Sequence, residues 1–360
     1  MKKSRSKAFF ISGGAGRVIC SIPAFEKYAE DSGDKDFIIV CEGGMDFYRG
    51  HPLLHKHAYE VWHKGLFDQH IRDKDIVTPE PYRINEYFNQ ECSLAQAFDI
   101  EINGLEDPRE LPVPTVTLNK METVTGYQTI QEIKAGVNKD KAIIIQPFGR
   151  TITKMGEHLV DGTSRSFELG NICNIIGILR EKYAVIIMSE IPFQVPQNEK
   201  HPIAFPKEPN LRLWASMINS ADHFLGCDSV GQHIAKALGK TATVVVGSTV
   251  PINITYLDDD DFDVIDFGHE KGREYSPIRL TMDDEIDRGN DKIMMLETLE
   301  EKRVVDSCVE FLGESKPFSG KFEPTQPNQS CGTPAPTTTE EQKPKDLPNY
   351  DFNTTNLLET

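Results

Sequence analysis

Short apolar runs alternate along the chain with longer amphipathic stretches. The runs are rich in β-branched and aromatic residues, which predicts buried strands. They cover Lys7–Ser12, Phe37–Val40, Lys141–Gln146, Tyr183–Met188, Phe224–Leu225 and Thr243–Val246. Between them, apolar residues spaced three and four positions apart predict helices. These cover Arg17–Asp31, Tyr82–Phe98, Met121–Ala135, Phe167–Arg180, Leu211–Ser220 and Ile293–Leu312. Strands that alternate with helices predict an α/β fold with parallel sheets.

The strand–helix–strand unit from 224 to 249 carries the clearest functional signal. Its first strand stops before Asp228 and Ser229, and its second stops before Ser248 and Thr249. Ligands of open parallel sheets bind outside the carboxyl ends of the strands. Asp228 or Ser229 can cap the helix between the two strands, and the free N–H groups at the start of this helix suit a phosphate.

A glycine-rich turn, Gly13-Gly14-Ala15-Gly16, separates the first strand from the helix that follows it. Because Gly14 and Gly16 carry no side chain, the backbone there can approach a ligand closely. The alternative is a tight turn without a ligand, and the turn alone does not decide between the two.

Both segments resemble glycosyltransferase family 9, the heptosyltransferase-like enzymes. That family has an Asp-Ser/Thr-Gly-x-x-His segment at the start of a helix, then Ala-Leu-Gly-Lys/Pro and a strand that ends in Gly. The matching residues here are Asp228, Ser229, His233, Ala237-Leu238-Gly239-Lys240 and Gly247. The family's glycine is Val230 here, with Gly231 one place later. The stretch from Gly16 to Ala24 is similar to the start of the family's first helix.

The resemblance implies the GT-B fold, in which two Rossmann-like domains with parallel sheets face a central cleft. We expect an acceptor-side domain over residues 1–115, a connector with a helix over 116–140, and a nucleotide-sugar-binding domain over 141–312. The composition changes after residue 312 to many prolines and few apolar residues, which predicts a disordered tail over 313–360.

The resemblance also implies a donor site in the second domain. Its residues would be Gly149, Arg165, Glu190, Asp228, Ser229, Gly231, His233, Ser248 and Thr249. Arg165 would neutralise the diphosphate, Gly149 would belong to a loop facing it, and Glu190 would bind a ribose. The turn glycines Gly14 and Gly16 would face the same ligand. The alternative for Arg165 and its neighbours Arg150 and Lys154 is that they are solvated surface cations.

Arg17 departs from the family pattern, because the family has its catalytic base, an Asp, at this position. An arginine stays protonated and cannot act as a base, but it can hold a phosphate or an acidic acceptor. Another carboxylate, Asp46 or Glu42, would then accept the acceptor proton. We therefore expect a glycosyltransferase that transfers a sugar to a glycan or lipid-linked acceptor. A scaffold protein that has lost catalysis is the main alternative, and hydrolysis or epimerisation of a nucleotide sugar is the third.

The composition of the chain narrows the classes of binding partner that we expect. The net charge of −17 argues against nucleic acid or an anionic membrane as the main partner. No apolar run approaches the length of a membrane-spanning helix, and no secretory signal is predicted, so we expect a cytoplasmic protein. Peripheral membrane contact and the oligomeric state stay open. The seven scattered cysteines are typical of a reducing compartment.

We expect no metal and no cofactor apart from the donor substrate. His51, His55 and His57 lie close together in sequence, but no cysteine or carboxylate joins them at a recognised zinc spacing. The acidic run from Asp258 to Asp261 is more typical of a solvated loop than of a metal site.

Overall fold

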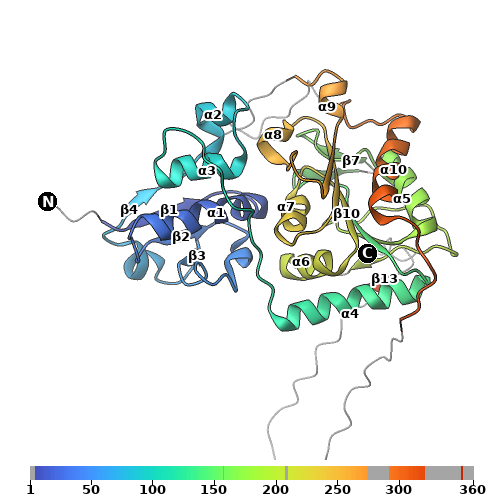
Figure 1. The fold of residues 1–360 in the computed structure, drawn as a ribbon, viewed down its shortest axis with the longest axis horizontal. Coiled ribbons are helices and arrows are strands. Elements are labelled where there is room, and N and C mark those ends of the chain that lie inside the picture. The colour runs from blue at the N-terminus through green and yellow to red at the C-terminus, as the bar shows by residue number, and fades with distance from the viewer. Residues whose placement is uncertain (1–4, 157, 207–209, 275–291, 321–349, 352–360) are drawn as a thin grey trace, which may run out of the picture.

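The computed structural model describes residues 5–156, 158–206, 210–274, 292–320 and 350–351 (Figure 1). Two parallel sheets form its framework, with strand orders β3-β2-β1-β4 and β12-β11-β10-β5-β8. Every pair of neighbouring strands within these two sheets is parallel. The predicted α/β architecture of two Rossmann-like halves is therefore confirmed.

The first sheet and its helices occupy the N-terminal third of the chain. The strands are β1 (Lys7–Ile11), β2 (Ile38–Cys41), β3 (Ala58–Glu60) and β4 (Asp75–Val77). The helices are α1 (Ala15–Asp31), α2 (Asn85–Phe88) and α3 (Leu94–Asn103), with short turns η1 (Met45–Tyr48), η2 (Phe67–Ile71) and η3 (Pro81–Arg83).

A long helix, α4 (Lys120–Val137), leads to the second sheet and fills most of the predicted connector. The strands that follow are β5 (Ala142–Gln146), β6 (Ile152–Met155), β7 (His158–Asp161), β8 (Ala184–Ile187), β9 (Phe205–Pro206), β10 (His223–Cys227), β11 (Ala242–Val246), β12 (Phe262–Asp266) and β13 (Tyr350–Asp351). The helices are α5 (Leu169–Lys182), α6 (Leu211–Ser220), α7 (Val230–Ala237), α8 (Pro251–Ile254), α9 (Phe267–Glu270) and α10 (Thr298–Leu312).

The second sheet is covered on both faces, which is why its strands are continuously apolar. Ile144 and Val244 pack toward α4, α6 and α7, whereas Ile143 and Ile145 pack toward α5 and α10. The first sheet is layered differently. Phe9 packs toward α1 and α3, while the cluster on the opposite face is small and consists of Ala8, Ile38, Val40, Leu66 and Ile71.

The two halves share one buried core. Side chains of β1 and α1 and side chains of β5, α7 and β11 belong to a single apolar cluster. Asn253 in α8 adds polar contacts between the two halves, because its Nδ2 donates to the backbone oxygens of Tyr87 (3.1 Å) and Cys92 (2.8 Å). The predicted domain boundaries stay predictions.

Some elements differ from the sequence interpretation. The single helix predicted over Tyr82–Phe98 is wrong: Gln90 has a φ of 63° and ends α2, and a capping box of Ser93 and Gln96 starts α3. The antiparallel hairpin β6–β7 was not predicted. The predicted disordered tail over 313–360 lies largely outside the described residues. Of its described part, Lys316 contacts Asp140 and β13 pairs with β9.

Candidate functional site

The glycine-rich turn after β1 touches the second half of the molecule. A Cβ atom added at Gly16 would lie 3.1 Å from His233 Cδ2 and 3.9 Å from Val230 Cα. One added at Gly14 would lie 3.3 Å from Arg150 Nη1. The segments that follow β1, β5 and β10 therefore meet, and they bring the predicted residues Gly14, Gly16 and His233 together. We call this region the junction.

Two helix N-termini adjoin at the junction, those of α1 and α7. Their N-cap residues are Gly14 and Ser229, and neither makes a side-chain capping hydrogen bond. Neither helix has an acidic residue in its first turn. Ser229 Oγ instead accepts from Gln146 Nε2 (3.0 Å), and Gln146 Oε1 accepts the N–H of Gly231 (2.8 Å). The predicted cap by Ser229 is therefore not formed.

Asp228 does not cap α7 either. Its carboxylate is buried, with Oδ1 accepting from Gln232 Nε2 at 3.0 Å and Oδ2 lying 3.6 Å from Arg165 Nη1. Asp228 thus holds a cation beside the start of α7.

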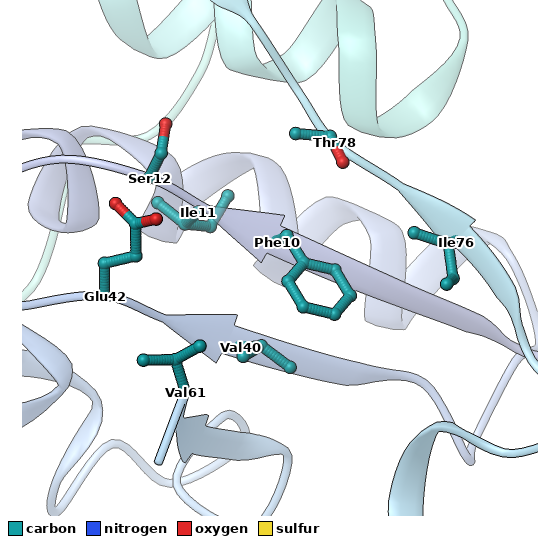
Figure 2. A pocket seen from close by; sticks show the side chains of 8 residues that line it. All are labelled: Phe10, Ile11, Ser12, Val40, Glu42, Val61, Ile76 and Thr78. Carbon is teal, nitrogen blue, oxygen red and sulfur yellow. The ribbon is translucent and has the colours of Figure 1, made fainter. Parts of the chain in front are cut away.

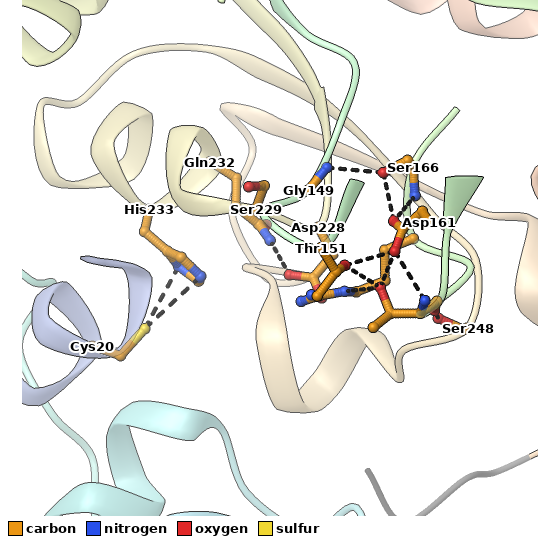
Figure 3. A network of polar contacts seen from close by, with 12 residues as sticks. Cys20, Gly149, Thr151, Asp161, Ser166, Asp228, Ser229, Gln232, His233 and Ser248 are labelled. Carbon is orange, nitrogen blue, oxygen red and sulfur yellow. Dashed lines mark hydrogen bonds and ion pairs between the residues drawn. The ribbon is translucent and has the colours of Figure 1, made fainter. Parts of the chain in front are cut away.

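Asp161 is the centre of a polar network beside the start of α7 (Figure 3). Its carboxylate accepts hydrogen bonds from the hydroxyls of Thr151, Thr163 and Ser166. Burial acts to raise the pKa of Asp161, but these hydrogen bonds outweigh it and lower the pKa. Ser166 Oγ also accepts the N–H of Gly149 at 2.9 Å. Asp161 was missed in the sequence, although the dense turn chemistry of Asp-Gly-Thr-Ser-Arg-Ser (161–166) is a signal for it.

The same network positions Arg165. Its Nε donates to Thr163 Oγ1 (2.9 Å), and Ser248 Oγ ties this turn to the end of β11 by donating to Thr163 O (2.5 Å). A Cβ atom at Gly149 would lie 3.9 Å from Arg165 Nη2. Burial opposes the charge of Arg165, but Asp228 and Asp161 outweigh it and raise the pKa. The predicted residues Gly149, Arg165, Asp228 and Ser248 are therefore neighbours.

His233 is buried in α7 and lies against the first half. Its Nδ1 is 2.9 Å from Tyr256 Oη and 3.6 Å from Cys20 Sγ. Burial lowers the pKa of His233 to about 4, with Asp228 partly opposing this. The ring is therefore neutral at pH 7 and can donate or accept one proton, but it does not supply a positive charge.

Arg17 is buried, with only 5% of its surface exposed. Its guanidinium lies over the rings of Tyr82 (4.8 Å) and Phe98 (5.4 Å), and Nη1 is 3.4 Å from Glu80 Oε1. Glu80, which follows β4, was not identified from the sequence. Buried polar atoms without a hydrogen-bond partner in the described part of the chain include Arg17 Nε and Nη2, Gln232 Oε1 and Thr249 Oγ1.

The other predicted carboxylates have separate environments. Glu42 Oε2 accepts the N–H of Gly13 at 3.1 Å and so borders the glycine-rich turn. Asp46 Oδ1 is 3.2 Å from Arg49 Nη1, in the turn η1. Glu190 is exposed beyond the end of β8, the edge strand next to β5.

The histidines near the N-terminus hold the backbone of their own region. His51 Nδ1 accepts the N–H groups of Leu53 and Leu54, and His57 Nδ1 bonds Phe37 O. In the described residues no group of three or more His, Cys, Asp or Glu could hold a metal ion. Among the described helices, none is long and apolar enough to cross a membrane.

Comparison with known proteins gives structural neighbours only. No family model and no curated protein matches the sequence. The glycosyl transferase family 9 structure from Veillonella parvula DSM 2008 aligns with a TM-score of 0.61 and 14% identity, over 86% of this chain and 98% of that one. The E. coli ADP-heptose lps heptosyltransferase II aligns with a TM-score of 0.55 and 11% identity, over 85% and 98%.

The expectation that no metal takes part does not hold for every structural neighbour. The glycosyltransferase TibC from enterotoxigenic E. coli H10407 is described as iron-containing and dodecameric. It aligns with a TM-score of 0.49 and 10% identity, over 86% of this chain and 77% of that one. The first two alignments show that the chain has the GT-B fold of the family 9 glycosyltransferase and heptosyltransferase structures.

Proposed function

We propose that this protein is a glycosyltransferase that binds the diphosphate of a nucleotide-sugar donor at the junction. The observation that carries the proposal is the meeting of two helix N-termini whose own N-cap residues make no side-chain capping bond, with Arg165 held beside them. Gln146 takes one N–H of α7, that of Gly231. The similarity of the fold to two glycosyltransferase structures supports it.

The electrostatics of the junction favour an anion. Each helix start carries roughly half a positive charge, and the starts of α1 and α7 adjoin. Arg165 adds a positive charge, which the neighbouring carboxylates of Asp228 and Asp161 partly offset, and Arg150 reaches the turn at Gly14. An anion between these groups would relieve the repulsion between like helix ends. Thr249, three residues after the end of β11, also has a buried hydroxyl without a hydrogen-bond partner.

In the transfer step the acceptor oxygen forms a bond to the anomeric carbon of the sugar. The bond from that carbon to the diphosphate oxygen breaks, and the electron pair leaves with the diphosphate. Arg165 and the helix starts stabilise the negative charge that develops there. The acceptor proton passes to a carboxylate. Glu42 borders the glycine-rich turn, whereas Glu80 is paired with Arg17 and Asp46 is paired with Arg49.

Titration calorimetry with ADP, GDP and UDP tests the donor site. Wild-type protein is expected to bind one of them, and Arg165→Met is expected to weaken binding by about tenfold or more, since a charge-assisted bond to phosphate is lost. Lys154→Met is the matched control, because Lys154 is an exposed cation on the hairpin β6–β7. Equal binding by both variants, or no binding to any nucleotide, would contradict the proposal. Binding without sugar transfer would favour the scaffold alternative.

A further inference from the structure

The first sheet has a hollow of about 340 Å³ on the face that α1 does not cover (Figure 2). The strand register explains which side chains form its floor. Phe10 is paired with Val40 and Ala8 with Ile76, and directly paired residues of parallel strands share a face. Phe10, Val40, Ile76 and Val61 therefore point to the same side of the sheet, as Figure 2 shows.

The floor of the hollow is apolar and accessible. Ile76 and Val61 are 61% and 43% exposed. The short turn η2 with Leu66 and Ile71 covers the neighbouring part of this face but leaves the hollow open. Exposed apolar side chains gathered around a hollow are typical of a binding site rather than of a random surface.

The polar rim of the hollow leads to the junction. Ser12, Thr78 and Glu42 line it, and Glu42 accepts the N–H of Gly13, the first residue of the glycine-rich turn. Gly14 follows Phe10 by four positions, which span at most about 13 Å of chain. A molecule of ordinary length can therefore fill the hollow with one end and reach the junction with the other.

The charge of the hollow selects the class of ligand. Glu42 is the only ionisable residue among those that line it, and no lysine, arginine or histidine does. The whole chain carries a net charge of −17. A phosphate, sulfate or carboxylate group would therefore be repelled here, whereas a hydroxyl group can donate to Glu42.

We propose that this hollow binds the apolar part of an uncharged, hydroxyl-bearing acceptor and presents its hydroxyl group at Glu42. The assignment of this ligand as the acceptor rests on the proposed function, whereas the site itself does not. An acceptor of this class differs from an anionic carbohydrate, because its affinity comes from buried hydrocarbon rather than from ion pairs.

The test uses two probes with the same chain and different head groups, n-octyl β-D-glucoside and sodium octyl sulfate, below the concentrations at which they form micelles. Binding to the full chain is followed by calorimetry and by tryptophan fluorescence, in which Trp62, next to Val61 in the sequence, is the exposed reporter and Trp214 is buried. The glucoside is expected to bind, and the sulfate is expected to bind at least about tenfold more weakly because of Glu42. Glu42→Gln is expected to remove most of that difference.

Ile76→Asp places a charge on the apolar floor at a position that is 61% exposed, and urea unfolding of this variant checks that it folds. It is expected to weaken glucoside binding by about tenfold or more. Ile178→Asp, at a 43% exposed position in α5, is the matched control and is expected to bind as wild type does. Trp62→Phe is expected to lose the fluorescence signal but not the calorimetric one.

Three results would overturn the proposal. They are equal binding of glucoside and sulfate, unchanged binding in Ile76→Asp, and a wild-type dimer that Ile76→Asp converts to a monomer in sedimentation, which would make this face an interface between copies. Nucleotide binding is measured on the same samples. If the glucoside binds and no nucleotide does, the proposed function fails while the hollow stands as a ligand site. If a nucleotide binds and the glucoside does not, the hollow fails and the donor site stands.

Discussion

At the scale of residues, the junction depends on contacts between positions far apart in sequence. The family pattern pointed to Gly16, Asp228, Ser229 and His233, and the structure brings these residues to the junction. The family pattern could not point to Glu80, which lies 63 positions from its partner Arg17, or to Cys20, which lies 213 positions from His233. Turn chemistry and helix starts can be read locally, whereas such partners depend on how the sheets are placed.

Two buried histidines are expected to make stability depend on pH. Burial lowers the pKa of His223 to about 3 and that of His233 to about 4, from an ordinary 6.5. The unfolded chain therefore binds more protons than the folded one below pH 6.5. The contribution of these neutral histidines to the free energy of unfolding is fully present above pH 6.5 and is lost as the pH falls toward 4 and 3. For each histidine the loss is about 1.4 kcal/mol per pH unit.

Urea unfolding at pH 7.5 and pH 5 measures this dependence. His223→Gln, which can keep a hydrogen bond to Thr243, is expected to remove about 2 kcal/mol of the difference between the two pH values. The exposed His63, replaced by Gln, serves as control and is expected to leave the difference unchanged. A wild-type stability that is the same at both pH values would refute the argument.

Arg17 and Glu80 are expected to behave as a buried pair. Arg17→Asp alone places two carboxylates between Tyr82 and Phe98 and is expected to cost about 3 kcal/mol of unfolding free energy. Adding Glu80→Arg restores opposite charges and is expected to recover at least half of that loss. Arg83→Asp, at an exposed position in η3, controls for the change in net charge. Additive losses in the double variant would mean that the two groups do not interact.

At the scale of elements, the central strands of both sheets and most of the long helices could be predicted within two or three residues, because their apolar period is regular. The outer strands β3, β4 and β12 were not predicted. The failure at Tyr82–Phe98 has a local cause. The apolar period continues across the break, and only the capping box of Ser93 and Gln96 signals a new start. The hairpin β6–β7 has exposed, mixed side chains and gives no apolar pattern to detect.

The packing of α4 on α6 is expected to depend on one glycine. A Cβ atom at Gly126 would lie 2.3 Å from the backbone oxygen of Ser216. Gly126→Ala must therefore separate the two helices and is expected to destabilise the protein by about 1–3 kcal/mol. Gly177→Ala in α5 is the matched control. A Cβ atom there meets nothing within 4 Å, so this change is expected to stabilise by about 0.5–1 kcal/mol. Thermal and urea unfolding of both variants checks the opposite signs.

At the scale of the whole molecule, the two halves are expected to unfold together. One apolar cluster crosses from β1 and α1 to α7 and β11, and Asn253 is buried between the halves. Calorimetry is expected to show a single transition whose calorimetric and van't Hoff enthalpies agree. Asn253→Ala leaves the backbone oxygens of Tyr87 and Cys92 without this donor and is expected to lower the transition temperature. Two resolved transitions in the wild type would show that the halves are independent.

The glycine-rich turn contacts both halves of the molecule. Glu42 accepts the N–H of its first residue, Gly13, while Arg150 and His233 of the second half lie close to Gly14 and Gly16. Any ligand that shifts this turn from one side alters its fit on the other side. Thermodynamic linkage then requires the effect to be mutual. A molecule bound near Glu42 changes the affinity for an anion at the helix starts by some factor, and the anion changes the affinity for that molecule by the same factor. The glycine-rich turn would thus make the affinities of two substrates depend on each other.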